Sequence, residues 1–312
     1  VQKLRSRRQR ASRYDEGTYG ELVELYLQHM DGEVTKQKIA PGTRDTYTGI
    51  LKRTLPILGN ADLSTFDDVT IERILDTLTS TPATHNNMLK ALRRMFKFAK
   101  KPGRLILENP TDGVQPVEFE TDGFLEWSDE QIAHFLDFHP IGSTAHLAVT
   151  LYLYTACRRS DVVLLGPKNI KEYDGRSYIE FVPRKGNLRN TKTVFAPLDP
   201  YIEHVLEQTE TGSETFLLNE YRQPYSAKGF GNRMRKWIDA AGLPKDISSH
   251  GIRKRTGSIF AESQSSEFQI MAAHGHSSPK ASEVYTRKAK RRVLSEQNYH
   301  NADITKRFGL GN

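Results

Sequence analysis

Cysteine is nearly absent from this chain of 312 residues, in which Cys157 stands alone. A single thiol cannot close an internal disulfide, so the fold does not depend on cross-links of that kind. Such a composition suits a reducing compartment, and we expect a cytoplasmic protein. The same scarcity removes the cysteine clusters that commonly bind zinc.

Long apolar runs are lacking as well. No stretch approaches the roughly 20 uninterrupted apolar residues that a membrane-spanning helix requires. The basic N-terminus has no apolar segment of the kind found in secretory signals. Hydrophobic residues make up 37% and charged residues 27% of the chain, which is typical of a globular protein long enough for two domains. We expect no membrane partner.

Motifs for nucleotide-driven or metal-driven chemistry are missing too. The sequence has no Walker-type glycine loop and no His-Glu-x-x-His helix. His274 and His276 lie close together, but two histidines without carboxylates make a poor metal site. The sequence therefore predicts neither a bound metal nor another cofactor.

Acidic residues are fewer than basic ones, and the excess of basic residues is unevenly distributed along the chain. The formal net charge of +7 is a modest indication of a polyanionic partner. Residues 1–13 hold six basic residues and no acid, a pattern that fits either a phosphate-binding arm or a disordered tail. The segment 84–100 also lacks acids, so its basic side chains are candidate contacts to a DNA backbone. The predicted contacts among them are Lys90, Arg93, Arg94 and Lys97.

Helical periodicity dominates the first 114 residues. Apolar residues spaced at i, i+3 and i+4 predict four helices, which begin near Thr18, at Thr43, near Val69 and near Thr84. Turn-forming residues between 109 and 116 end this unit. We predict a basic tail (1–13), a helical domain (14–114), a linker (115–123), a second domain (124–292) and a C-terminal tail (293–312).

The second domain has a mixed pattern. Ser128 and Gln131 form a capping box that opens a helix, and an apolar helix follows at 145–156. Short β-rich segments at 178–182 and 193–196 flank a polar, basic turn and predict a small sheet. Helices are expected again at 202–208, at 228–241 and from Arg253 onward. The predicted fold class is mainly α with a small antiparallel β-sheet, an α+β architecture.

Two arginines are candidates for binding a phosphate. Arg158 and Arg253 each offer a permanent charge and a planar fork that matches two phosphate oxygens, as a phosphoryl-transfer transition state requires. Asp161 lies one helical turn after Arg158, so it either forms a structural ion pair with this arginine or orients it. Arg159 would point elsewhere on a helix.

Proton transfer needs further groups. His250 precedes Arg253 by three residues, so both reach one phosphate if they lie at the start of a helix. A lysine in the basic turn between the two strands would protonate a departing oxygen. The spacing alone does not choose between Lys185 and Lys192.

A tyrosine would complete this set. Transfer of a phosphodiester without ATP requires a covalent intermediate, which a tyrosyl phosphate provides. Tyr285 follows His276 by nine residues, on a polar, basic helix that we expect to start at Ser278 and Pro279. Tyr299 is the alternative nucleophile.

These motifs together resemble the signature of the tyrosine recombinases, the phage-integrase family. The matching segments are residues 155–161 (TACRRSD), 250–253 (HGIR), 275–278 (GHSS) and Tyr285. The resemblance implies that Arg158 and Arg253 clamp the scissile phosphate and that His276 supports it. It implies further that His250 assists proton transfer. Tyr285 would attack the phosphate and form a 3′-phosphotyrosyl bond. The resemblance also implies Lys185 as the catalytic lysine, and the long turn leaves Lys192 open. One departure is Ala272-Ala273-His274, where the family usually has bulkier apolar residues.

The resemblance extends to architecture and partners. It implies a two-domain clamp around double-stranded DNA, with an N-terminal helical core-binding (SAM-like) domain and a C-terminal catalytic domain. The helix at 228–241 would then lie against DNA through Lys228, Arg233, Arg235 and Lys236. A homo-tetramer on two DNA sites, with a Holliday-junction intermediate and protomer contacts through the tail (293–312), would follow. The free protein would be a monomer or weak dimer, located at the nucleoid.

Three functions are consistent with these residues. The leading hypothesis is a site-specific DNA recombinase of the integrase or excisionase type that works without metal or ATP. A type IB topoisomerase-like enzyme that nicks and relaxes DNA shares the chemistry, but the helical core-binding domain favours recombination. A catalytically inactive DNA-binding regulator of the same fold is disfavoured by the complete set of candidate residues.

Overall fold

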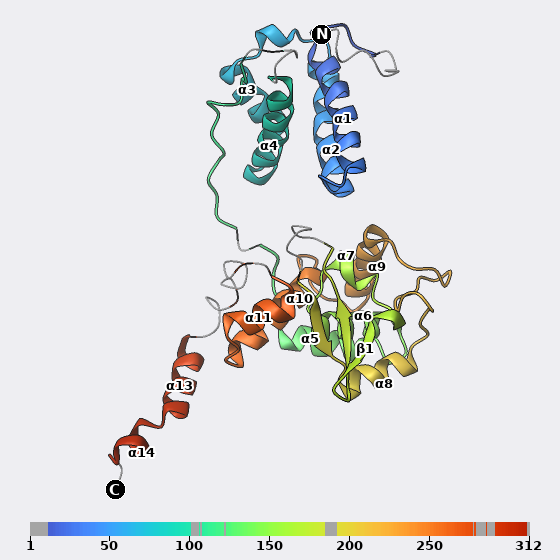
Figure 1. Cartoon of the computed structure of the whole chain (residues 1–312), viewed down its shortest axis with the longest axis vertical. Helices are drawn as coiled ribbons and strands as arrows, with labels where there is room; N and C mark the ends of the chain where they lie inside the picture. The colour runs from blue at the N-terminus through green and yellow to red at the C-terminus, as the bar shows by residue number, and fades with distance from the viewer. Residues whose placement is uncertain are drawn as a thin grey trace. The chain divides into compact units, whose positions relative to one another are not determined.

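The computed structural model describes residues 12–100, 106, 108–121, 123–184, 192–276, 278, 285 and 291–310. The chain divides into two compact units, residues 1–121 and 122–312 (Figure 1). Each unit buries its own hydrophobic cluster. Within the described part of the chain, no helix is long and apolar enough to cross a bilayer.

The N-terminal unit is built around one helical core. Tyr19 is fully buried there, where its ring stacks on Phe66 with 5.3 Å between the centroids and its hydroxyl bonds with that of Thr54 at 2.9 Å. In its described residues the unit consists of α1 (Tyr19–Thr35), α2 (Pro41–Leu58), the 3₁₀ helix η2 (Leu63–Thr65), α3 (Asp68–Leu78) and α4 (Pro82–Ala99).

Two of these helices begin earlier than the sequence predicted. α2 begins at Pro41 rather than at Thr43, because proline at the first helical position has a suitable φ and needs no amide partner. α4 begins after the N-cap Thr81, whose hydroxyl accepts a hydrogen bond from the amide of Thr84, while the Thr84 hydroxyl accepts one from the Thr81 amide. Thr84 is therefore the third residue of its helix rather than the first.

The C-terminal unit combines helices with a three-stranded sheet, which confirms the predicted α+β class. Its described elements are α5 (Asp129–Phe138), α6 (Thr144–Thr155), α7 (Arg159–Val162), η3 (Pro167–Asn169), β1 (Ile170–Tyr173), β2 (Arg176–Phe181), β3 (Val194–Pro197), α8 (Pro200–Gln208), α9 (Ala227–Ala240), α10 (Ser249–Glu262), α11 (Glu267–His274), α13 (Arg291–Ala302) and α14 (Ile304–Phe308).

The sheet is antiparallel in the order β1-β2-β3, with Ile179 of β2 paired to Ile170 on one side and to Ala196 on the other. The first strand was not predicted, because all four of its residues are exposed and show no apolar alternation. The signal that could have revealed it is Asp174-Gly175. Both residues have positive φ, as the two-residue turn of a β-hairpin requires.

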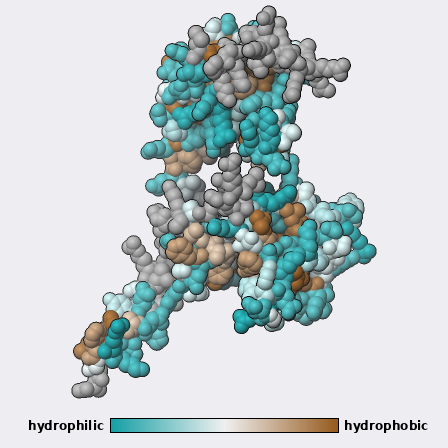
Figure 2. All heavy atoms as spheres, in the orientation of Figure 1, coloured by the Kyte–Doolittle hydropathy of each residue, from teal (hydrophilic) through white to brown (hydrophobic). Residues whose placement is uncertain are grey.

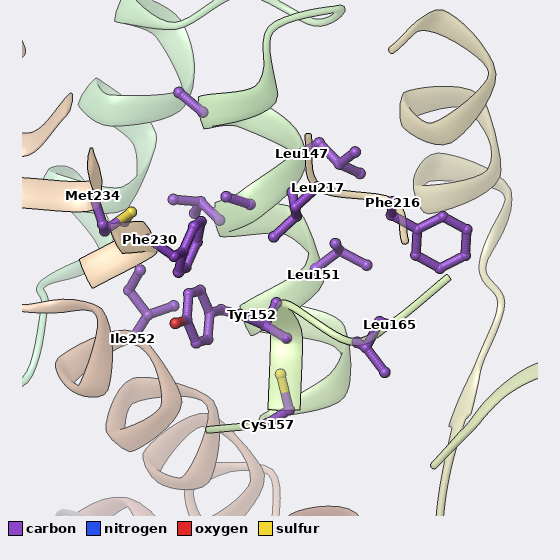
Figure 3. Packing of buried hydrophobic residues seen from close by; sticks show 14 of the residues in the cluster. Leu147, Leu151, Tyr152, Cys157, Leu165, Phe216, Leu217, Phe230, Met234 and Ile252 are labelled. Atoms are coloured by element: carbon purple, nitrogen blue, oxygen red, sulfur yellow. The ribbon is translucent and has the colours of Figure 1, made fainter. Parts of the chain in front are cut away.

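Helix α6 forms the centre of the C-terminal core. Nearly every residue along it is buried, and Figure 3 shows Leu147, Leu151 and Tyr152 surrounded by side chains from other elements. The ring of Tyr152 faces that of Phe230 on α9, with 6.3 Å between the centroids. The helix ends at Thr155, and the left-handed conformation of its C-cap Ala156 turns the chain toward the paired arginines.

The start of α10 is held by the segment that precedes α5. The indole of Trp127 donates to the carbonyl oxygen of Ser248 at 2.9 Å, and Leu125 pairs with Ile247 in a parallel bridge. A Cβ atom on Gly251 would lie 2.1 Å from the carbonyl oxygen of Leu125, so this close approach requires glycine. The helix that carries the His-x-x-Arg motif is thereby fixed at its first turn.

Gly275 ends α11 and packs closely against the sheet. Its φ of +61° lies in the left-handed region, and a Cβ atom there would stand 2.7 Å from Pro183 and 3.0 Å from Val194. We expect Gly275→Ala to lower the free energy of unfolding by about 2 kcal/mol, because backbone strain and a steric clash add up. Thermal unfolding of the full chain measures this loss.

Gly175 provides the matched control for this substitution. Its φ of +70° imposes the same backbone strain, but an added Cβ would meet nothing within 4 Å. Gly175→Ala should therefore cost only about 1 kcal/mol. Equal losses in the two variants would contradict a steric role for Gly275.

Candidate active site

Arg253 lies at the centre of a buried polar cluster where α11 packs against α10 (Figure 1). Only 3% of this residue is exposed. Its guanidinium donates hydrogen bonds to the carbonyl oxygens of Ala156 and His274, the latter at 2.9 Å, and to Nε2 of His276 at 2.9 Å. Three stretches of chain that are distant in sequence therefore meet at one side chain.

His276 is a neutral imidazole in this cluster. Burial lowers its pKa to about 4, with the charges of Arg253 and Arg158 acting in the same direction. Because its Nε2 accepts a hydrogen bond from Arg253, we assign the ring proton to Nδ1. His276 therefore adds no positive charge of its own to the cluster.

Tyr285 completes the cluster from its own chain. Its ring lies nearly parallel to that of His276, with 6.0 Å between the centroids, and 7% of the residue is exposed. It also covers Gly257 of α10, where a Cβ atom would stand 2.7 Å from the ring. Burial raises the pKa of the phenol, while the charge of Arg253 and a hydrogen bond from it act in the opposite direction.

Arg158 stands next to this cluster. It is half-buried at the N-cap position of α7. Burial lowers the pKa of Arg253, and the nearby charge of Arg158 lowers it further. Two guanidinium groups held close together repel each other, so the arrangement favours an anion between them.

Asp161 is fully enclosed behind the paired arginines, and 3% of it is exposed. Its Oδ1 accepts hydrogen bonds from the backbone amide of Arg184 at 3.0 Å and from the hydroxyl of Ser160 at 3.3 Å. Asp161 thus fixes the backbone at Arg184, beyond the end of β2 at Phe181. Sequence reasoning assigned it to Arg158 alone and did not foresee this contact.

His250 lies one helical turn before Arg253 on α10, as the spacing predicted. Its half-buried ring faces that of Phe124, with 4.6 Å between the centroids. The spacing left two candidate lysines for the basic turn. Lys185 lies outside the described residues, and Lys192 is exposed just before β3.

The other candidates lie apart from this cluster or outside the described residues. Tyr299 is exposed on α13. Residues 279–284 and 286–290, which include most of the helix expected around Tyr285, are not described. Among the described residues, no group of three histidines, cysteines or carboxylates could hold a metal ion.

On α4, the predicted basic face is partly committed to the fold. Lys90, Arg94 and Lys97 are exposed, and the guanidinium of Arg94 lies 5.7 Å from the ring centroid of Tyr47. Arg93 is half-buried and donates to the carbonyl oxygen of Val114. Arg93 therefore ties the end of the helical unit to α4 as well as adding charge.

On α9, one of the four predicted DNA contacts also bonds to the backbone of the fold. Arg235 donates to the carbonyl oxygens of Lys245 at 3.0 Å and Ile247 at 2.8 Å, and it forms an ion pair with Asp239 at 2.9 Å. These bonds hold the loop that leads into α10. Its neighbour Lys236 is exposed. Lys228 is exposed as well, and Arg233 lies over the ring of Trp237.

Adjacent residues of α9 therefore allow a matched test. We expect Lys236→Gln to reduce the slope of log Kd against log salt by about 1, because one phosphate contact is lost. Arg235→Gln should leave that slope unchanged and lower the free energy of unfolding by about 2 kcal/mol, since it removes bonds to backbone carbonyls. DNA-binding titrations at several salt concentrations, with thermal unfolding of both variants, measure these effects. A reduced slope for Arg235→Gln alone would reverse the assignment.

Sequence reasoning missed the ionic network behind α10. Arg255 forms ion pairs with Asp129 at 2.7 Å, Glu262 at 3.1 Å and Glu126 at 3.3 Å. Glu126 also accepts a hydrogen bond from the hydroxyl of Ser258 at 2.9 Å. The network joins the segment before α5 to the helix that carries Arg253. Its two halves, the segment before α5 and helix α10, are far apart in sequence, and no local spacing signals it.

Comparison with known proteins decides the family. The model of the Phage integrase family matches residues 127–292, which is more than half of the chain. The chain belongs to this family. The expectation of a tyrosine recombinase, a strand-transferring enzyme, is thereby confirmed.

Relatives of this family member align over most of its length. The integrase of Mycobacterium phage D29 is 24% identical over 276 residues, covering 81% of this chain and 71% of the relative. The tyrosine recombinase XerC of Chlamydia caviae is 21% identical over 239 residues, covering 70% and 72%.

Solved structures share the fold of this family member. A lambda integrase (75–356) dimer bound to a COC′ core site aligns with a TM-score of 0.71 and 17% identity, over 88% of this chain and 97% of that one. The Tn1549 transposon integrase in complex with transposon right-end DNA aligns with a TM-score of 0.66 and 15% identity, over 94% and 99%.

Proposed function

We propose that this protein is a site-specific DNA recombinase of the integrase or excisionase type, which cleaves and rejoins DNA through a 3′-phosphotyrosyl intermediate. The observation that carries the proposal is the packing of Tyr285 against His276 and beside Arg253 within one chain. A guanidinium that holds the non-bridging oxygens of a phosphate stabilises the charge that builds up during attack on phosphorus.

The proposed cleavage step exchanges one phosphate ester for another. The phenol oxygen of Tyr285 forms a bond to phosphorus as the bond from phosphorus to the 5′ oxygen breaks. Because burial raises its pKa, the phenol is protonated at neutral pH and must give up its proton as it attacks. We assign that proton to His250 and assign protonation of the 5′ oxygen to Lys185, with Lys192 as the alternative. Rejoining reverses these transfers when a 5′ hydroxyl attacks the tyrosyl phosphate.

The phosphate itself would be bound by three groups. Arg158 and Arg253 supply positive charge, and the neutral imidazole of His276 supports the phosphate. Asp161 supports this arrangement by fixing the turn that begins at Arg184. Because the phosphodiester energy is stored in the tyrosyl bond, neither ATP nor a metal is required.

Double-stranded DNA is the proposed partner. On the N-terminal unit, proposed as the core-binding domain (14–114), hydrophilic residues cover most of the visible face in Figure 2. Backbone contacts are assigned to Lys90, Arg93, Arg94 and Lys97 of α4 and to Lys228, Arg233 and Lys236 of α9. The linker (115–123) would connect this domain to the catalytic domain (124–292), and we propose that the protein acts on DNA in the cytoplasm.

The proposed active assembly is a tetramer on two DNA sites. One structural relative is a lambda integrase tetramer bound to a Holliday junction, which aligns with a TM-score of 0.71 and 17% identity over 88% of this chain and 80% of that one. In the C-terminal tail, Ile304, Phe308 and Leu310 are exposed, and Figure 2 shows apolar side chains at this end of the chain. Apolar residues left in contact with water suit a contact between protomers.

A two-plasmid assay tests the proposed function against its alternatives. The full chain is incubated, in EDTA and without ATP, with two plasmids that carry short inverted repeats taken from the DNA flanking its gene. Recombinant plasmids are the expected product. Relaxed plasmids without recombinants would favour the topoisomerase-like enzyme, and binding without any strand breakage would favour the inactive regulator.

A further inference from the structure

His274 is a buried histidine that the proposed chemistry does not use. It is the last residue of α11, and 1% of it is exposed. It belongs to the segment in which this chain departs from the bulkier apolar residues that the family resemblance implies. A polar ring in such a place needs a reason, because burying it without partners is unfavourable.

Two hydrogen bonds connect His274 and Arg253. The Nε2 atom of His274 lies 3.2 Å from the carbonyl oxygen of Arg253, and the carbonyl oxygen of His274 accepts a hydrogen bond from the Arg253 guanidinium at 2.9 Å. One contact fixes the backbone of the arginine and the other fixes its charged end. Together they define the direction in which the arginine side chain extends.

The ring of His274 also forms one wall of the space that the Tyr285 ring occupies. Its centroid lies 5.0 Å from that of Tyr285, 5.3 Å from that of His276 and 6.0 Å from that of Phe260. An aliphatic side chain could fill this wall, but it could not also donate a hydrogen bond to the Arg253 carbonyl. The same imidazole thus contacts both the arginine and the tyrosine.

The hydrogen-bond pattern defines one tautomer. Because Nε2 faces a carbonyl oxygen, it must carry the proton, and Nδ1 is buried without a hydrogen-bond partner. The ring is surrounded by Arg253, His276, Tyr285 and Phe260. A second cation there would repel the guanidinium, and burial together with the charge of Arg253 lowers the pKa of His274 to about 3.

We propose that His274 is a positioning residue that fixes the Arg253 guanidinium and the Tyr285 ring relative to each other. This role rests on the proposed function. His274 acts through Arg253 and through the tyrosine ring rather than on phosphate. Its neutral Nε2–H tautomer performs this role without adding charge to the site.

Two substitutions separate positioning from simple packing. His274→Leu fills the wall but removes the donor, whereas His274→Gln retains an N–H group near the position of Nε2. In single-turnover cleavage of a nicked suicide substrate, we expect His274→Leu to react about tenfold more slowly, because small displacements of reacting groups reduce rates by one to two orders of magnitude. His274→Gln should remain within about threefold of the wild type by the same argument.

DNA affinity provides the control in these experiments. It should be the same in all three proteins, because His274 is buried and carries no charge. A wild-type rate for His274→Leu, or a rate for His274→Gln as low as that of His274→Leu, would overturn the proposal.

A second measurement does not depend on cleavage. In the full chain labelled with ¹⁵N-histidine, the signal that disappears in His274→Leu should report an Nε2–H tautomer and should not titrate between pH 5 and 8. A titrating ring, or an Nδ1–H tautomer, would contradict the hydrogen bond from Nε2 to the Arg253 carbonyl oxygen. If the wild type forms no covalent adduct, the proposed function fails while this measurement still decides the placement of His274.

Discussion

Tyr285→Phe is expected to abolish covalent attachment of DNA while leaving DNA binding intact. The substitution removes only the phenol oxygen, and the ring can still pack against His276 and over Gly257. Loss of a nucleophile should reduce cleavage by about four orders of magnitude or more, because the covalent intermediate cannot form. A suicide substrate nicked near the crossover, analysed on denaturing gels, measures the adduct directly.

Tyr299 supplies the control for this experiment. It is exposed on α13 and makes no contact with the Arg253 cluster that the structure describes. Tyr299→Phe should trap as much DNA as the wild type. Trapping by Tyr285→Phe, or loss of trapping in Tyr299→Phe, would move the nucleophile to another residue.

Arg158→Lys is expected to slow cleavage by about 10²–10³-fold, the usual cost of removing one preorganised group that stabilises transition-state charge. Lysine keeps the positive charge but cannot form the planar two-point contact with phosphate oxygens. Because Arg158 is only half-buried, the melting temperature and the DNA affinity should change little. Near-normal cleavage by this variant would rule out its role in the clamp.

Arg253→Lys should behave differently, which makes the two arginines a matched pair. The Arg253 guanidinium is buried and bonds to the carbonyl oxygens of Ala156 and His274. We therefore expect a comparable loss of cleavage accompanied by a loss of about 3 kcal/mol in the free energy of unfolding. An unchanged melting temperature for Arg253→Lys would contradict the structural part of its role.

Local spacing predicted the parts of the site that lie on single helices. His250 and Arg253 are three residues apart, so any helix places them on one side, and α10 does so. Ser128 and Gln131 form the predicted capping box of α5. Such features depend only on residues within one helical turn of each other, so the sequence spacing is enough to predict them.

Other features depend on contacts between distant segments and could not be predicted from local pattern. Arg235 lies in a basic run that predicts a DNA contact, and its hydrogen bonds to carbonyls of the loop after α9 had no local signal. β1 escaped prediction because an exposed edge strand has no buried side to impose alternation. The two hydrogen bonds between His274 and Arg253 join α11 to α10, and no local pattern predicts them either.

The anchoring of Arg253 makes cleavage depend on complete folding. Its guanidinium points toward the tyrosine only when two carbonyl oxygens, contributed by residues 97 and 21 positions away, have both reached their final places. A chain still emerging from the ribosome, or one partly unravelled by heat, could hold DNA through exposed lysines and yet would lack an aligned arginine. We expect such immature protein to leave chromosomes unbroken, so that the capacity to cut appears last during maturation and is the first to be lost.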